Sequence, residues 1–204
     1  MNVVLASGNA GKLEELHAVL APLGVTLRTQ RQLGISDADE TAITFVENAL
    51  IKARHAPAAG NMPAIADDSG LVVPALGGAP GVLSARYAGS PSDAAANNRK
   101  LIAALAGVIE RRAYFVCSLV FLRDAEDPAP LIATATWYGR IVDRPAGAGG
   151  FGYDPHFLVD GFDQTAAELP ASVKNRISHR GQAAALLVDA IRSAPDEMQR
   201  PTRS

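Results

Sequence analysis

Two neighbouring carboxylates, Asp67 and Asp68, are strong candidates for chemistry in this sequence. Asp67 and Asp68 follow an apolar run at residues 64–66 and precede Ser69. A carboxylate at the end of a buried strand must be solvated, paired with a cation or bound to a metal ion, and oxygen ligands suit Mg²⁺. Successive strand residues point to opposite faces, so we expect only one of the two carboxylates to face a given pocket. An Asx turn at Asp68 and Ser69 is the alternative interpretation.

A loop of small residues follows the first apolar run of the chain, residues 3–6. It reads Ser-Gly-Asn-Ala-Gly-Lys over residues 7–12 and precedes apolar residues at helical spacing. Small residues let backbone amides approach an anion at a helix N-terminus, and Lys12 adds a mobile positive charge. The loop lacks the spacing of a Walker A motif, and a plain glycine turn fits the same pattern. Asn9 and Lys12 favour a phosphate-binding loop.

Two later segments combine glycine with aromatic or cationic side chains. Residues 149–155 contain Phe151, which could stack on a nucleotide base, and Asp154, which could accept a hydrogen bond from a ring N–H. Lys174 and the Ser-His-Arg-Gly segment at residues 178–181 supply cations at the start of a helix. Aromatic side chains packed in the core and a solvated, serine-capped helix end are the alternative interpretations.

These segments stand at the ends of expected strands and helices. Apolar runs predict strands at residues 3–6, 25–29, 64–66, 71–73, 114–122, 131–142 and 157–159. Helical spacing predicts helices at residues 13–23, 44–59, 92–106 and 178–191, the second opened by a Thr-x-x-Glu capping box at Thr44. The result is an α/β fold with one long sheet and helices on its flanks.

Composition and net charge exclude several classes of protein. Of 204 residues, 48% are apolar, and 19 basic against 21 acidic side chains leave a net charge of −2. We therefore expect a globular protein without the basic field that holds nucleic acid. Cys117 is the only cysteine, which excludes an intrachain disulfide and cysteine-based metal frameworks. The sequence has no leader and no apolar span of about 18 residues, and so predicts a cytoplasmic protein with no membrane partner.

Six ordered segments, taken together, resemble the inosine triphosphate pyrophosphatase family over about residues 3–187. They are residues 7–12, 45–49 with Lys52, 66–70, 77–81, 149–155 and 178–181. Ser7 stands where this family more often has threonine, which keeps the hydroxyl. The resemblance implies a long central mixed sheet flanked by helices, two lobes with the active-site cleft between them, and a homodimer. We expect one such two-lobed domain at residues 1–193 and a flexible tail at residues 194–204.

The resemblance also implies an activity. Members of the family hydrolyse the non-standard purine nucleotides ITP, dITP and XTP to the monophosphate and pyrophosphate with Mg²⁺, which cleanses the nucleotide pool. Glu40 and Asp68 would bind the metal, and Asp68 would also activate water. Arg86 is a further candidate for a phosphate contact. The implied substrate-binding residues are Ser7, Gly8, Asn9, Ala10, Gly11, Lys12, Lys52, Ser69, Phe151, Gly152, Tyr153, Asp154, Lys174, His179 and Arg180.

Two other functions stay open. A nucleotide pyrophosphatase with another base preference would keep the phosphate loop and the acidic pair and would need a different base pocket. A non-catalytic purine nucleotide sensor would need no base at the α-phosphate, and the presence of Lys12, Glu40 and Asp68 argues against it.

Overall fold

The computed structural model describes residues 2–7, 15–17, 19–20, 24–58 and 62–194. These residues form two compact units. Unit 1 holds the described residues of Met1–Asp68, Cys117–Ala135 and Arg180–Ser204, and unit 2 holds Ser69–Val116 and Thr136–His179. The two-lobed domain and its cleft stay predictions. Residues 195–204 of the expected tail lie outside the described residues.

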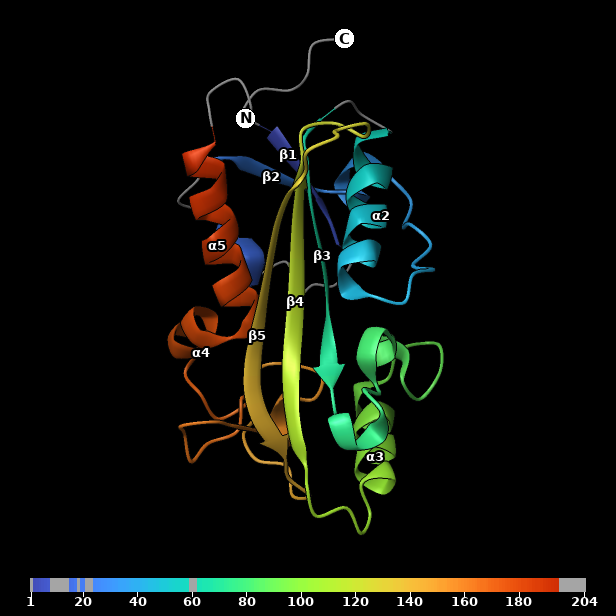
Figure 1. Ribbon diagram of the computed structural model, residues 1–204, viewed down its shortest axis with the longest axis vertical. Helices are drawn as coiled ribbons and strands as arrows, with labels where there is room; N and C mark the ends of the chain where they lie inside the picture. Colours follow the sequence, from blue (N-terminus) through green and yellow to red (C-terminus); the bar gives the residue numbers. More distant parts are fainter. Residues whose placement is uncertain (1, 8–14, 18, 21–23, 59–61, 195–204) are drawn as a thin grey trace. The chain divides into compact units, whose positions relative to one another are not determined.

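The described strands form one mixed sheet of six strands in the order β2-β1-β3-β4-β5-β6 (Figure 1). They are β1 (Asn2–Ala6), β2 (Thr26–Thr29), β3 (Ala64–Val72), β4 (Arg112–Leu122), β5 (Leu131–Ile141) and β6 (Phe157–Val159). Strand β1 pairs in parallel with β2 and with β3, whereas β5 and β6 are antiparallel. The α/β fold with a mixed sheet is thereby confirmed.

One strand differs from the expected pattern. Residues 64–66 and 71–73 were expected as separate runs, but Ala64–Val72 is a single strand, so Asp67 and Asp68 lie within it. The Asx-turn interpretation is therefore wrong. Carboxylates are tolerated inside a buried strand only when cations oppose them, which makes the neighbours of these two side chains decisive.

The helices are α2 (Phe45–Ala58), α3 (Ala94–Ala104), α4 (Ala171–Ile177) and α5 (His179–Ser193). Within the described residues there are also four short 3₁₀ helices, η2 (Arg31–Leu33), η3 (Pro74–Leu76), η4 (Gly81–Arg86) and η5 (Asp154–His156). Thr44 caps α2 as the capping-box pattern predicts, because its hydroxyl accepts a hydrogen bond from the Glu47 N–H at 3.3 Å. Of the expected helix at residues 13–23, only residues 15–17 and 19–20 are described, and they are helical. No helix in the described ranges is long and apolar enough to cross a membrane.

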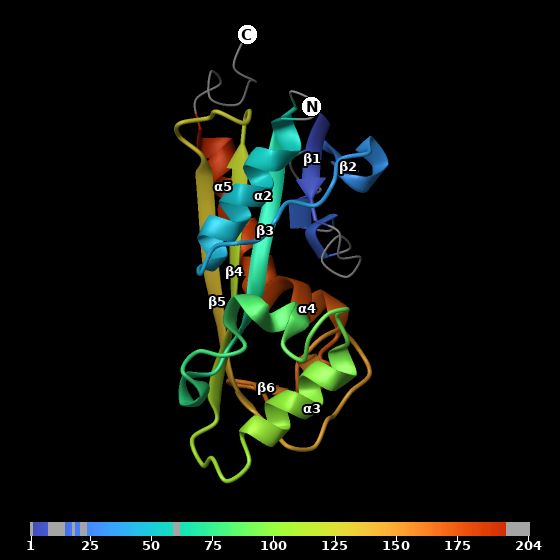
Figure 2. The same cartoon turned by 90° about the vertical axis from the view of Figure 1, so that its right-hand side faces the viewer.

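Unit 1 has a hydrophobic core on each face of its strands. Strand alternation sends Leu5 and Ile65 to one face, where they pack with Leu187 of α5. The intervening residue Ala66 packs on the other face with Ala53 of α2. In Figures 1 and 2, α2 and α5 accordingly lie on opposite sides of the strands. The two helices can therefore present side chains to the two faces of β3.

Unit 2 has its own core, built around aromatic rings. The ring centroid of Phe157 lies 4.7 Å from that of Phe115 and 5.3 Å from that of Trp137. Leu101 of α3 and Tyr153 belong to the same cluster. This core supports the glycine-rich segment that precedes β6.

The turn that joins β4 to β5 in unit 1 contains an ion pair between Asp127 and Arg123. Asp127 accepts hydrogen bonds from the Arg123 backbone N–H at 3.0 Å and from Arg123 Nε at 2.8 Å. The hydrogen bond from the Arg123 side chain lowers the pKa of Asp127 from 3.8 to about 2, although burial opposes this shift. A lowered pKa means that the folded state favours the carboxylate form.

This shift predicts how the stability of the Asp127→Asn variant depends on pH. Relative to the parent protein, the variant should lose about 2 kcal/mol of unfolding free energy at pH 7, because each pKa unit corresponds to about 1.4 kcal/mol. The pKa is lowered on folding, so the contribution is complete above pH 3.8 and disappears as the pH falls through about 2. Urea unfolding of both proteins from pH 7 to pH 2 measures the difference, and a difference independent of pH contradicts the prediction.

Candidate active site

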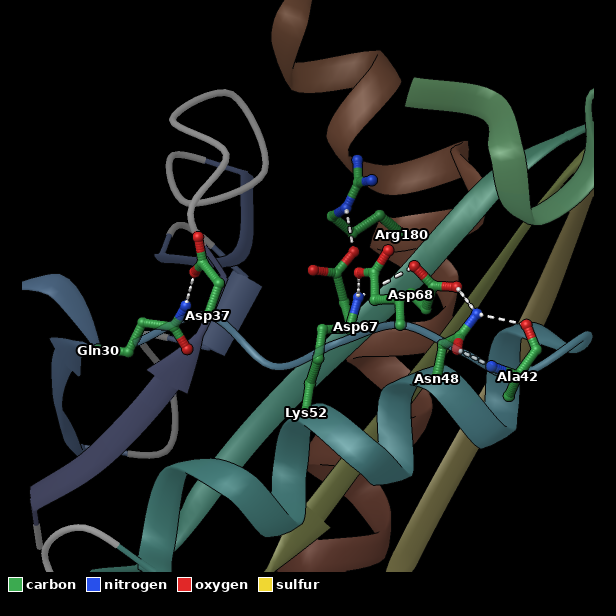
Figure 3. A network of polar contacts seen from close by, with 9 residues as sticks. Gln30, Asp37, Ala42, Asn48, Lys52, Asp67, Asp68 and Arg180 are labelled. Atoms are coloured by element: carbon green, nitrogen blue, oxygen red, sulfur yellow. Dashed lines mark hydrogen bonds and ion pairs between the residues drawn. The ribbon is translucent and has the colours of Figure 1, made fainter. Parts of the chain in front are cut away.

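Strand β3 sends its two carboxylates to opposite faces of unit 1. The Asp67 side chain is 0% exposed and that of Asp68 is 8% exposed. Asp68 lies on the face covered by α2, and Asp67 lies on the face where α5 packs (Figure 3). The two carboxylates thus point to opposite faces of the strand, as alternation predicts, and which of them faces a substrate pocket stays a prediction.

A cluster of three side chains gathers around Asp68. Lys52 Nζ lies 2.7 Å from Glu40 Oε1 and 3.0 Å from Asp68 Oδ1. Asn48 Nδ2 lies 3.4 Å from Asp68 Oδ2. Lys52 and Asn48 are one helical turn apart on α2, so they occupy the same face of that helix. The structure thus brings together Glu40, Lys52 and Asp68, with Asn48 beside them as the helical spacing from Lys52 predicts.

Asn48 also holds the segment that carries Glu40. Its side chain accepts a hydrogen bond from the Ala42 N–H at 3.0 Å and donates one to the Ala42 carbonyl at 3.2 Å (Figure 3). A side-chain amide that pairs with both groups of one backbone residue fixes the position of that residue. Asn48 therefore links the segment before α2 to the carboxylate on β3.

Lys52 is the positive centre of this cluster. Burial lowers the pKa of Lys52, but the charges of Asp67 and Asp68 and the hydrogen bond to Glu40 outweigh it and raise the pKa above its ordinary value. Lys52 is therefore protonated at neutral pH. Its ammonium offsets part of the repulsion between the carboxylates of Glu40 and Asp68.

Glu40 and Asp68 are suitable ligands for a hard cation. Both place a carboxylate oxygen within 3.0 Å of one ammonium nitrogen, so the two oxygens converge on a common region. The described part of the chain holds no group of three or more His, Cys, Asp and Glu side chains arranged for a metal ion. Mg²⁺ keeps several waters and commonly takes one or two carboxylates with substrate phosphates, so this oxygen pair fits an open magnesium site.

Arg180 lies on the opposite face of β3, near the start of α5. Its Nε lies 3.7 Å from Asp67 Oδ2, and its Nη1 donates a hydrogen bond to the carboxylate of Glu15. The Arg180 side chain is 3% exposed. Burial lowers its pKa, but the charges of Asp67 and Glu15 contribute to raising it above the ordinary value. A buried guanidinium between two carboxylates is a paired charge with a fixed position.

In unit 2, the glycine-rich segment covers a buried ion pair. Lys174 Nζ lies 2.7 Å from Asp154 Oδ2, and both side chains are buried. The same oxygen accepts a hydrogen bond from the Phe151 N–H at 2.9 Å, and Lys174 Nζ lies 5.2 Å from the centroid of the Phe151 ring. Lys174 comes from α4, a helix that sequence reasoning missed. The structure thus brings Phe151, Asp154 and Lys174 together.

The remaining aromatic side chains of the predicted set pack inward. The Tyr153 hydroxyl donates a hydrogen bond to the Ser84 carbonyl at 2.8 Å, and burial raises the pKa of Tyr153. The His179 ring stacks on Phe115 with centroids 4.8 Å apart. The interpretation of core packing therefore holds for Tyr153, whereas the Phe151 side chain is 37% exposed.

The other predicted residues divide into those that the structure describes and those that it does not. Ser7 is buried at the end of β1, and its N–H donates a hydrogen bond to the Leu5 carbonyl at 3.0 Å. Ser69 is half-buried on β3. Residues 8–12 of the predicted phosphate loop lie outside the described residues. The roles assigned to all these residues stay predictions.

Glycine at position 150 is required by the buried pair beneath it. A Cβ at Gly150 would lie 2.1 Å from Asp154 Oδ2 and 3.0 Å from Lys174 Nζ, whereas a Cβ at Gly152 would meet nothing within 4 Å. Both residues have positive φ, so alanine at either position strains the backbone by about 1 to 2 kcal/mol.

We therefore expect Gly150→Ala to lower the free energy of unfolding more than Gly152→Ala does. The excess should be about 2 kcal/mol, because the new methyl group must displace a paired and buried side chain. Urea unfolding of the two variants measures it, with Gly152→Ala as the matched control for backbone strain. Equal losses in the two variants contradict a packed ion pair under residue 150.

Comparisons with known proteins agree on the family of this chain. The model of the Ham1 family matches residues 3–190. The chain is similar to proteins named dITP/XTP pyrophosphatase, with 55% identity to that of Ralstonia nicotianae (93% of this chain, 96% of that protein) and 57% to that of Nitrosomonas europaea (93% of each). A solved HAM1 protein from Coxiella burnetii covers 95% of this chain and 100% of its own, with 45% identity and a TM-score of 0.89. The chain belongs to the Ham1 family, which confirms the family relationship indicated by its motifs.

Proposed function

We propose that this chain is a dITP/XTP pyrophosphatase, which hydrolyses dITP, XTP and ITP to the nucleoside monophosphate and pyrophosphate. The observation that carries the proposal is the cluster around Lys52, which places the carboxylates of Glu40 and Asp68 within 3.0 Å of one ammonium. The names of the relatives, which are 55% and 57% identical over nearly the whole chain, supply the substrate class. Removal of these substrates would cleanse the purine nucleotide pool.

Magnesium is part of this proposal, with Glu40 and Asp68 as its ligands. When bound, Mg²⁺ would offset the charge of the triphosphate and polarise the leaving pyrophosphate. The donor set supports this assignment because both ligands are carboxylates and Lys52 already occupies a position between them as a cation.

Asp68 is the base in the proposed reaction. An ammonium 3.0 Å from its Oδ1 and an amide 3.4 Å from its Oδ2 both favour its carboxylate form. As a carboxylate, it accepts a proton from the water that attacks the α-phosphorus. Lys52 supplies a fixed positive charge next to this reaction, and a fixed charge stabilises the negative charge that develops on the phosphoryl oxygens in the transition state.

Recognition of the base follows from donor and acceptor chemistry. Hypoxanthine and xanthine carry a carbonyl at C6, whereas adenine carries an amino group there. The Arg180 guanidinium has only hydrogen-bond donors, so it can donate to the C6 carbonyl of hypoxanthine or xanthine. It is mismatched with the C6 amino group of adenine, which is itself a donor. A buried mismatch of this kind can discriminate by about four to five decades. We also propose that the exposed ring of Phe151 stacks on the purine. The homodimer stays a prediction.

The Asp68→Asn variant tests the base. Its kcat should fall by about two to four decades, the usual contribution of a general base, while the nucleotide still binds. The rate of pyrophosphate release gives kcat, and equilibrium binding of ITP shows whether the variant still binds the nucleotide. The control is Asp189→Asn, which makes the same chemical change on the exposed face of α5 and should leave kcat unchanged. Turnover by Asp68→Asn close to that of the parent protein removes Asp68 from the mechanism.

A panel of nucleotides tests the activity itself. Release of pyrophosphate and of orthophosphate is measured with dITP, XTP, ITP, GTP, ATP and dUTP, each with Mg²⁺ and with a chelator. We expect pyrophosphate from the first three, little from GTP and ATP, and none with the chelator. Pyrophosphate from dUTP or ATP instead would indicate another base preference, and tight ITP binding without turnover would indicate a sensor.

A further inference from the structure

The proposed reaction gives no task to Asp67, although its carboxylate is among the most buried charges in the structure. Its side chain is 0% exposed, and strand alternation turns it away from the face where Lys52 holds Glu40 and Asp68. A carboxylate in such a place is costly unless a cation compensates it. Among the described residues, Arg180 lies on the same face, with Nε 3.7 Å from Asp67 Oδ2.

The contacts of Arg180 fix the orientation of its guanidinium. The Nη1 group of Arg180 donates a hydrogen bond to the Glu15 carboxylate, and the Asp67 carboxylate lies next to Nε. A guanidinium is planar, so a hydrogen bond to Glu15 at one nitrogen and an ion pair with Asp67 at 3.7 Å from another restrict both its position and its plane. The directions in which its N–H groups can donate are then restricted as well.

Lys52 is paired with other carboxylates besides Asp67. The charge of Asp67 is the largest of the causes that raise the pKa of Lys52, but Lys52 also lies within 3.0 Å of both Glu40 and Asp68. Loss of the Asp67 charge therefore leaves Lys52 paired with two carboxylates. At Arg180, the same loss removes the carboxylate next to Nε (Figure 3) and leaves the contact of Nη1 with Glu15.

We propose that Asp67 is a positioning residue, which holds the Arg180 guanidinium in the orientation from which it donates hydrogen bonds to the bound nucleotide. Asp67 itself touches neither the substrate nor the metal. This inference rests on the proposed function, because it assigns Arg180 a contact with the nucleotide. The neighbouring carboxylates of β3 then have separate tasks, with Asp68 in the chemistry and Asp67 in substrate binding.

Steady-state kinetics with dITP and Mg²⁺ test this division. Asp67→Asn should raise KM about tenfold, which corresponds to about 1.4 kcal/mol of lost binding, and leave kcat within about threefold of the parent value. Glu15→Gln should also raise KM, since it loosens the same guanidinium from its other side. Asp189→Asn, an exposed change on α5, should leave both parameters unchanged.

A double-mutant cycle identifies the partner through which Asp67 acts. In an Arg180→Lys background, which keeps the positive charge but not the planar fork, Asp67→Asn should change KM less than twofold. A tenfold effect in that background overturns the proposal, because Asp67 would then act independently of the guanidinium. An unchanged KM for Asp67→Asn in the parent background also overturns it, since a purely structural role lowers the fraction of active enzyme and not the affinity of the remainder.

Two further results keep the test decisive. Where Asp67→Asn does not fold, Asp67→Glu takes its place, because it keeps the charge and displaces the carboxylate by one methylene. A raised KM in this variant supports the proposal, and a parental KM overturns it. Failure of the parent protein to release pyrophosphate from dITP would instead overturn the proposed function, and that result is obtained before any variant is compared.

Discussion

The organisation of unit 1 depends on two neighbouring carboxylates that point to opposite faces of one buried strand. Each must have a cation on its own side, because an unpaired charge in the interior costs several kcal/mol. Lys52 of α2 forms an ion pair with Asp68, and Arg180 of α5 forms one with Asp67. In the described part of the chain, both helices that cover β3 thus also supply it with a positive charge. Electrostatics and packing therefore require the same arrangement of helices.

Local patterns in the sequence predict those features that depend on spacing within one element. The opposite orientation of Asp67 and Asp68 follows from strand alternation, and the shared face of Asn48 and Lys52 follows from the helical repeat. The family motifs indicate Glu40 as a partner of Asp68, and the structure places both at Lys52. For these residues, the grouping around Asp68 could be predicted before any coordinates, whereas their chemical roles stay predictions.

Contacts between distant segments could not be predicted in this way. Lys174 and Asp154 are 20 residues apart, and Arg180 and Glu15 are 165 residues apart. No periodicity connects them, because the fold alone brings them together. The continuous β3 was missed for a related reason, since Asp, Ser and Gly favour turns locally. The cations that keep this segment extended come from other elements.

The face of β3 next to α2 is packed almost entirely with alanine. Ala49 and Ala53 of the helix and Ala64 and Ala66 of the strand are all completely buried. Alanine has no rotamers through which it could absorb an extra atom, so the spacing between helix and strand is set by the backbones themselves. A larger residue would push α2 outward and carry Lys52 with it. Sequence drift in this family should therefore be most restricted at some positions that bear no functional group at all.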